Sequence, residues 1–132
     1  MTLRERQNQF IEDLSMFDNW TGRFTHLISL SEELPTVFPD YLLRYRVEGC
    51  QSKTCFLPRM HNDLLYVAGW SNSAVMGGIV VAMTTIFNFT SRMEFRSTEI
   101  DFHTASGLID NLTPVRRSAL EEMIGRITVL LK

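Results

Sequence analysis

Ala74-Val75-Met76-Gly77-Gly78-Ile79-Val80-Val81-Ala82-Met83-Thr84-Thr85-Ile86-Phe87 is the longest apolar run of the chain. Because apolar residues cover all sides of this run, we predict a buried helix that packs against a sheet. Ser71 or Ser73 can cap its start, since a serine hydroxyl accepts a hydrogen bond from a free N–H of the first turn. The run is shorter than the roughly 20 residues that a membrane-spanning helix needs. It therefore predicts the central helix of a globular fold.

Short apolar stretches that precede this run predict a sheet. Residues 43–47 alternate between apolar and basic side chains, and residues 53–59 and 64–70 form two further short apolar segments. Such segments are typical of strands, and the turn signal at residues 61–63 separates the last two. We expect three short antiparallel strands, with residues 49–52 as the first connecting turn.

Apolar residues at helical spacing predict helices near both ends of the chain. Residues 3–17 form one amphipathic helix, and a second begins after Asp18 or Asn19 and continues until Pro35. The last helix has Thr113 as its cap and Pro114 at its first position, both favourable there. Residues 91–111 predict one or two short helices. The predicted class is α+β, a small three-stranded antiparallel sheet with helices packed on it.

Composition limits the classes of function. A chain of 132 residues, 45% hydrophobic and 21% charged, fits a single domain over residues 1–132. Thirteen basic against 15 acidic residues give a formal charge of −2, so nucleic acid is not expected as the main partner. The first residues are charged and lack the apolar core of a secretory signal, which predicts a cytoplasmic protein without a membrane partner.

The stretch Val47-Glu48-Gly49-Cys50-Gln51-Ser52 places a thiol in a polar turn. Gly49 can adopt a positive φ, and Gln51 and Ser52 can donate hydrogen bonds to a sulfur anion. The thiolate is the reactive form of cysteine, so this setting favours nucleophilic attack or sulfur exchange by Cys50. The alternative is a structural cysteine, because free cysteines are among the most often buried residues.

Other potential ligands do not form a site by their spacing. Cys50 and the second thiol, Cys55, form a C-x4-C pattern that, with three scattered histidines, matches a zinc site poorly, and a disulfide between them is not expected in a reducing compartment. His26, His61 and His103 are scattered, and none is placed to activate a thiol, as a cysteine hydrolase would need. We therefore expect no metal site. Nothing in the chain resembles a cofactor cradle such as a glycine-rich phosphate loop, so no cofactor is expected either.

Several segments, in order from about Phe10 to Ile127, resemble the SufE family of sulfur acceptors in iron–sulfur cluster assembly. They are Asn19-Trp20, Leu34-Pro35, Val47 to Ser52, Gly69 with Ser71 and Ala74, Gly78, Gly107-Leu108, Leu112-Thr113-Pro114-Val115-Arg116, Leu120-Glu121 and Met123-Ile124. The resemblance implies a fold shared with IscU-type scaffolds, a three-stranded antiparallel sheet with helices.

The resemblance also implies a chemistry centred on Cys50. In SufE-like proteins the cysteine of Gly-Cys-Gln-Ser takes sulfur, as a persulfide, from a pyridoxal-phosphate cysteine desulfurase and delivers it to an iron–sulfur cluster scaffold. Such a protein stimulates the desulfurase and is a covalent acceptor, not itself an enzyme. Arg116 matches the arginine that follows Leu-Thr-Pro in the family. We expect it to support the Cys50 anion or to meet an acidic group on the desulfurase, the alternative being a surface arginine or a structural ion pair.

Some residues depart from the family pattern. Asn72 stands where the family commonly has aspartate, Thr54-Cys55 replaces a bulkier apolar pair, and Ala119 replaces a glycine. Cys55 lies in a predicted strand, so we expect a small core residue and not a second sulfur site. The competing function is a non-catalytic adapter that binds a desulfurase-like enzyme while Cys50 stays idle.

Overall fold

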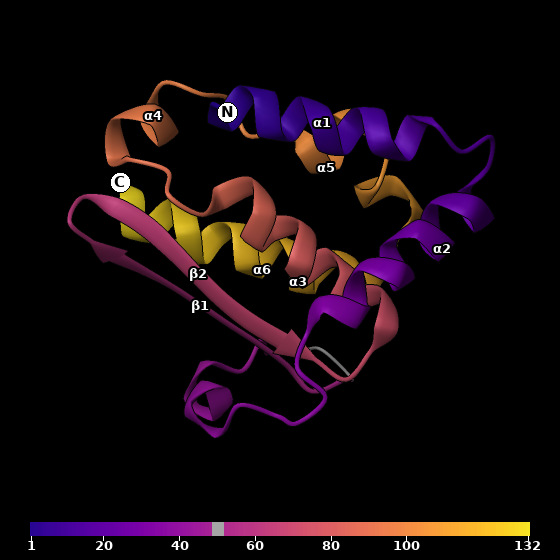
Figure 1. The fold of residues 1–132 in the computed structure, drawn as a ribbon, viewed down its shortest axis with the longest axis horizontal. Helices are drawn as coiled ribbons and strands as arrows, with labels where there is room; N and C mark the ends of the chain where they lie inside the picture. Colours follow the sequence, from indigo (N-terminus) through magenta and orange to yellow (C-terminus); the bar gives the residue numbers. More distant parts are fainter. Residues whose placement is uncertain (49–51) are drawn as a thin grey trace.

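The computed structural model describes residues 1–48 and 52–132, and Figure 1 shows how their helices and strands are arranged. The α-helices are α1 (Leu3–Ser15), α2 (Trp20–Leu30), α3 (Ala74–Phe87), α4 (Arg92–Arg96), α5 (Phe102–Ala105) and α6 (Pro114–Leu131). The strands are β1 (Thr54–His61) and β2 (Leu64–Ser71), and the short 3-10 helices are η1 (Ser31–Glu33), η2 (Asp40–Tyr45) and η3 (Ile109–Asn111). Helices packed on an antiparallel sheet confirm the predicted α+β class.

The two strands form a regular hairpin. β1 and β2 are antiparallel, with a register that runs from Thr54 opposite Ser71 to His61 opposite Leu64. The connecting residues Asn62 and Asp63 have φ values of 51° and 62°. Asparagine and aspartate tolerate this left-handed region better than most residues do, and such a pair suits a two-residue hairpin turn. The predicted turn at residues 61–63 is confirmed.

The prediction of a three-stranded sheet is wrong, because the sheet has two strands in the described residues. Residues 40–45 form the 3-10 helix η2, which starts with a hydrogen bond from the Leu42 N–H to the Pro39 carbonyl (2.9 Å). A single bridge between Arg46 and Cys55 remains of the expected first strand. The physical reason lies in burial: Leu42 and Val47 are buried while Leu43 is 55% exposed, a spacing that does not match the two-residue period of a strand.

Helix α3 lies at the centre of the molecule, as its sequence predicts, with α1 along one side and the hairpin along another (Figure 1). Ten of its 14 residues are buried. The Ser73 hydroxyl accepts a hydrogen bond from the Met76 N–H, which makes Ser73 the cap. No helix of the described residues is both long enough and apolar enough to cross a membrane.

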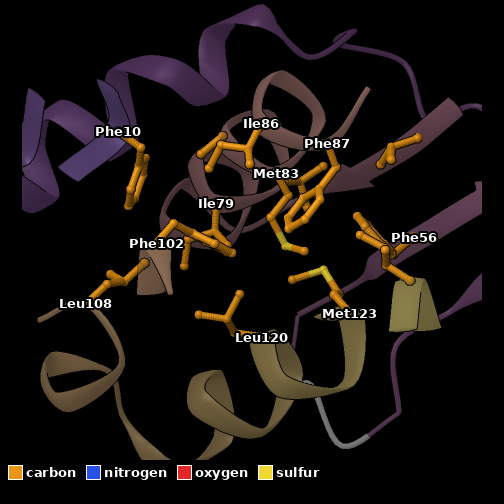
Figure 2. Packing of buried hydrophobic residues seen from close by; sticks show 14 of the residues in the cluster. Phe10, Phe56, Ile79, Met83, Ile86, Phe87, Phe102, Leu108, Leu120 and Met123 are labelled. Carbon is orange, nitrogen blue, oxygen red and sulfur yellow. The ribbon is translucent and has the colours of Figure 1, made fainter. Parts of the chain in front are cut away.

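The core forms where α3 meets the hairpin and α6. Figure 2 shows Ile79 and Met83 of α3 gathered with Phe56 of β1 and with Leu120 and Met123 of α6, all of which belong to the buried cluster. Their burial is the main source of stability, at about 25 cal/mol per Å² of apolar surface removed from water.

Gly78 allows a close approach between α3 and α2. A Cβ added at Gly78 would lie 1.9 Å from the carbonyl oxygen of Leu27, well inside a van der Waals contact. The absence of a side chain therefore permits the two helices to pack backbone to backbone.

The remaining helices follow most of the sequence predictions. The Asn19 side chain caps α2 by accepting a hydrogen bond from the Gly22 N–H. This helix ends at Leu30, earlier than predicted, and η1 occupies the residues before Leu34 and Pro35. Thr113 caps α6, and Pro114 is its first residue, both as predicted. The ambiguous region 91–111 contains the short helices α4 and α5, followed by η3.

Candidate functional site

The predicted site residues fall partly within the described chain. Gly49, Cys50 and Gln51 lie outside the described residues, whereas Ser52 and Arg116 are described. The surroundings of the site are therefore defined by its two flanks, residues up to Glu48 and residues from Ser52 onward.

The upstream flank is attached to β1 and to α6. Val47 is buried, and its N–H donates to the carbonyl oxygen of Thr54 at 2.8 Å. The N–H of Glu48 donates to the Glu122 carboxylate at 3.3 Å. The segment is thus held by β1 and by α6 up to Glu48, the residue that precedes Gly49. These tertiary contacts fix the position of Glu48.

Arg126 of α6 provides the strongest attachment of this flank. Its guanidinium donates to the carbonyl oxygens of Tyr45 (2.8 Å), Arg46 (2.6 Å) and Phe56 (2.7 Å). It also binds the carboxylate of Glu122, one helical turn away. Because the donors of a guanidinium point in fixed directions, a single arginine can join the segment, the strand and the helix.

Sequence reasoning did not find Arg126 or Glu122. A glutamate four residues before an arginine on a helix is a recognisable pair, and this signal was present. The carbonyl groups that Arg126 binds are about 70 to 80 residues away in the sequence. No local pattern indicates those partners.

The downstream flank leads to the start of α3 through a chain of hydroxyl groups. The Ser52 hydroxyl lies 3.1 Å from that of Thr54, which lies 2.8 Å from that of Ser71. The Ser71 oxygen accepts from the N–H of Ser73, the cap of α3, at 3.1 Å. Ser52, a predicted site residue, is therefore connected to the positive end of the central helix dipole.

Lys53, in the downstream flank, and Asn72, just after β2, are joined by two hydrogen bonds. The N–H of Lys53 donates to Asn72 Oδ1 at 2.9 Å, and the N–H of Asn72 donates to the Lys53 carbonyl at 3.0 Å. An aspartate at position 72 could accept the first of these bonds as well. The departure at Asn72 thus keeps the hydrogen-bonding role while it removes a negative charge from the start of α3.

An aromatic group packs over Lys53. The Lys53 Nζ lies 3.5 Å from the centre of the Phe38 ring, which meets Trp70 edge to face. The Trp70 indole donates to the carbonyl of Pro35 at 2.8 Å. This cation–π contact and the hydrogen bond from Trp70 hold the segment that contains Pro35 against the hairpin, close to the downstream flank.

Arg116 lies in the first turn of α6, where the sequence places it. Its N–H donates to the capping hydroxyl of Thr113 at 3.4 Å, and the residue is half-buried. Within residues 1–48 and 52–132 its guanidinium forms no ion pair. Arg117, the next residue, is exposed, donates to the Ile109 carbonyl at 3.1 Å and forms an ion pair with Asp110 at 3.8 Å.

Cys55 is a core residue, as predicted. It is 0% exposed and pairs with Trp70 of β2. Burial raises the pKa of the Cys55 thiol above its ordinary value, against the weaker opposing effect of Lys53, Arg46 and Arg126. The neutral thiol is therefore favoured, and a neutral thiol is a poor nucleophile.

Histidines and acids do not form a metal-binding cluster in the described residues. His61 is exposed at the end of β1, and the His26 ring packs against Phe17 at 5.4 Å. Burial lowers the pKa of His103, and its Nδ1 is buried without a hydrogen-bond partner among the described residues.

Comparison with known proteins identifies the family. The model of the SufE family, described as an Fe-S metabolism associated domain, matches residues 8–130. An uncharacterized SufE-like protein of Rhizobium etli is 23% identical over 126 residues, which cover 91% of this chain and 85% of that protein.

A solved structure has the same fold. The solution structure of a hypothetical protein from Thermus thermophilus superposes with a TM-score of 0.73 at 16% identity, covering 96% of this chain and 93% of that one. At this identity the likeness concerns the fold alone. Since the family model spans nearly the whole sequence, the chain belongs to the SufE family, whose domain is associated with iron–sulfur metabolism.

Proposed function

We propose that this protein is a sulfur acceptor and carrier that takes sulfur onto Cys50 from a pyridoxal-phosphate cysteine desulfurase. The observation that carries the proposal is the Gly-Cys-Gln-Ser sequence at residues 49–52, inside a SufE match over residues 8–130. The attachment of both flanks supports it, because a reacting group must be presented in a limited range of positions to meet a partner's persulfide.

The transfer is a thiol–persulfide exchange. The thiolate of Cys50 attacks the terminal sulfur of the persulfide on the desulfurase cysteine. A new S–S bond forms on Cys50, the S–S bond on the donor breaks, and the donor cysteine leaves as a thiolate. The bond electrons balance within this exchange, so the step needs no oxidant and no reductant.

The position of Ser52 near the start of α3 supports the proposal that Cys50 reacts as a thiolate. Ser52 connects to Ser71 and so to the start of α3, which carries no acidic residue in its first turn. The partial positive charge at a helix start stabilises a nearby anion. Chain connectivity ties Cys50 to Ser52, so we propose that its thiolate benefits from this field.

The remaining thiol is not suited to the transfer. Cys55 is fully buried and its pKa is raised, so it is neither accessible nor ionised at neutral pH. We propose that Cys50 alone carries sulfur, with Gly49, Gln51 and Ser52 as its supporting turn and Arg116 as a charged group that serves the transfer.

In this proposal the protein is not an enzyme in the usual sense. It holds no cofactor of its own, stimulates the desulfurase by removing its persulfide, and passes the sulfur to an iron–sulfur scaffold. Residues 1–132 act as one SufE-like domain, and the reaction takes place in the reducing cytoplasm, where thiols stay reduced.

Intact-mass spectrometry tests the proposal. The protein is incubated with a pyridoxal-phosphate cysteine desulfurase and cysteine, and its mass is measured before and after reduction. We expect a gain of one or more sulfur atoms that reduction removes. A protein that binds the desulfurase but never gains sulfur would instead be an adapter with an idle Cys50, which contradicts the proposal.

A further inference from the structure

An open groove lies on the surface between η2, β1 and α6. Its volume is about 670 Å³, and its walls are mainly apolar. Val129 is 74% exposed and Tyr45 is 37% exposed at this surface. Large apolar side chains that stay in contact with water beside a groove are typical of a binding surface.

Gly125 lines the groove and is not explained by packing within the chain. It lies in the interior of the 18-residue helix α6, where glycine is less favourable than alanine. A Cβ added at Gly125 would meet no atom within 4 Å, whereas a Cβ at Gly78 would collide with Leu27. The space over Gly125 therefore allows another backbone to approach α6 closely.

The edge of β1 in the groove is poorly suited to pairing with a further strand. The Phe56 carbonyl, which faces this edge, already accepts a hydrogen bond from Arg126. Pro58, two residues on, faces the same edge and has no N–H to donate. A helix, which satisfies its own backbone groups, fits this surface better than an extended peptide.

Charge on the lining indicates the character of the occupant. Three charged side chains line the groove, and two of them, Glu122 and Arg126, pair with each other. Arg44 is exposed and forms no ion pair within the described part of the chain. Beside it on η2, Leu43 is 55% exposed.

We propose that this groove docks an amphipathic helix of the cysteine desulfurase, with apolar residues toward Val129 and Gly125 and a carboxylate toward Arg44. The inference rests on the proposed function, because it names the sulfur donor as the occupant. Arg126 forms part of the groove and also binds the carbonyls of Tyr45 and Arg46, which lead toward Cys50. A donor seated in the groove thus lies against the segment that ends at the acceptor cysteine.

Binding measured apart from sulfur transfer tests the inference. Affinity for the desulfurase is determined by isothermal titration calorimetry in a Cys50→Ser background, in which no sulfur can be accepted at residue 50. The groove variants are Gly125→Leu, Val129→Glu and Arg44→Glu, and Met16→Glu is the control. Met16 is 76% exposed at the end of α1 and does not line the groove.

We expect each groove variant to weaken binding at least tenfold without lowering the thermal midpoint, and Met16→Glu to bind like the parent. If Gly125→Leu fails to fold, the affinities of the surface variants Val129→Glu and Arg44→Glu test the docking site. Parent-like affinity in these variants, while the wild-type chain still gains sulfur on Cys50, would overturn the docking site and leave the proposed function intact. Weakened binding without any sulfur on wild-type Cys50 would support the docking site and defeat the proposed function.

Two other occupants would also overturn the inference. If Val129→Glu converts a dimer into a monomer in analytical ultracentrifugation and does not change affinity for the desulfurase, the groove belongs to a second copy of this chain. If the groove variants lose binding only to the iron–sulfur scaffold protein, the groove serves sulfur delivery instead of sulfur uptake.

Discussion

The guanidinium of Arg126 lies 2.8 Å from the carbonyl oxygen of Tyr45, which is 81 residues earlier in the chain. Through this contact the C-terminal helix α6 holds the segment that leads toward Cys50. The same side chain binds Arg46 and Phe56, so one residue connects the upstream flank, the hairpin and α6. Stability and presentation of the flank are therefore coupled at Arg126.

Replacement of Arg126 by lysine tests this coupling. A lysine keeps the charge but cannot bind three carbonyl groups in fixed directions, so some of these exposed or partly buried acceptors lose their charged donor. We expect Arg126→Lys to lower the free energy of unfolding by about 1–3 kcal/mol and to slow sulfur uptake by Cys50. Urea denaturation and timed mass spectrometry measure the two effects.

Arg117→Lys is the matched control, since Arg117 is exposed, binds a single carbonyl and forms only an exposed ion pair with Asp110 that lysine can keep. It should change neither quantity appreciably. If Arg126→Lys behaved like Arg117→Lys in both measurements, Arg126 would not hold the flank.

The two thiols should differ in sulfur uptake. Cys50→Ser should abolish the sulfur adduct, because we propose that Cys50 is the acceptor. Cys55→Ser should keep it, since the Cys55 thiol is buried and its raised pKa disfavours the thiolate. Peptide digestion under non-reducing conditions locates the adduct, and its appearance on Cys55 of the wild-type chain would refute this assignment.

How far the sequence predicts this structure depends on the range of the interactions. The caps Asn19, Ser73 and Thr113 were predictable because a cap bonds residues only three positions away. The alternation at residues 43–47 gave a wrong strand because no local pattern shows that Arg126, far away in sequence, binds the carbonyls of Tyr45 and Arg46. Burial of Leu42 instead of Leu43 then favours the 3-10 turn.

The residues of the candidate site also differ in whether the sequence alone can identify them. The sequence Gly-Cys-Gln-Ser and the position of Arg116 after Leu-Thr-Pro are local, so the order of the residues is enough to find them. The roles of Arg126, Glu122 and Asn72 depend on groups brought together by folding. The hydroxyl chain from Ser52 to Ser71 likewise exists only once β1 and β2 pair.

Alanine substitutions at two helical glycines should have opposite effects on stability. Gly125→Ala should raise the free energy of unfolding by about 0.4–1 kcal/mol, because open space receives the methyl group and glycine is a poor helix former. Gly78→Ala should lower it by about 1–3 kcal/mol or more, because the Leu27 backbone must move away. Urea denaturation of both variants measures the difference, and equal stability would mean that α2 and α3 do not pack as described.

Acid should destabilise the protein in part through His103. Burial lowers its pKa in the folded state below 6.5, so the unfolded chain binds the proton more readily. The corresponding stability is present above pH 6.5 and is lost as the pH falls through the lower, folded-state pKa. Asp101 and Glu121 oppose the shift and reduce the effect.

The variant His103→Gln cannot titrate and isolates this contribution. We expect its free energy of unfolding to fall less between about pH 8 and pH 5 than that of the wild-type chain. Denaturation curves of the variant and the wild-type chain are measured at both pH values. The two proteins share all other titrating groups, so the difference reports on His103. A steeper fall in the variant would show that the folded protein prefers the protonated histidine.

A substitution of Arg116 should affect sulfur transfer without lowering the stability of the fold. An arginine in the first turn of a helix opposes the helix dipole, which costs about 0.3–1 kcal/mol at an exposed site. Arg116 is half-buried and forms no ion pair among the described residues that would offset this cost. Stability alone therefore does not favour arginine there, which supports the proposed role toward the Cys50 anion or toward a carboxylate of the desulfurase.

We expect Arg116→Gln to leave the thermal midpoint unchanged or slightly higher while it slows the gain of sulfur by Cys50. Arg117→Gln, which removes the same charge one residue later, is the control and should accept sulfur at the wild-type rate. Timed mass spectrometry at several desulfurase concentrations also separates the two roles. A loss that saturating desulfurase restores points to docking, whereas a loss that persists points to the thiolate of Cys50. If Arg116→Gln takes up sulfur as fast as the wild-type chain, or if it simply unfolds, Arg116 has no role in the transfer.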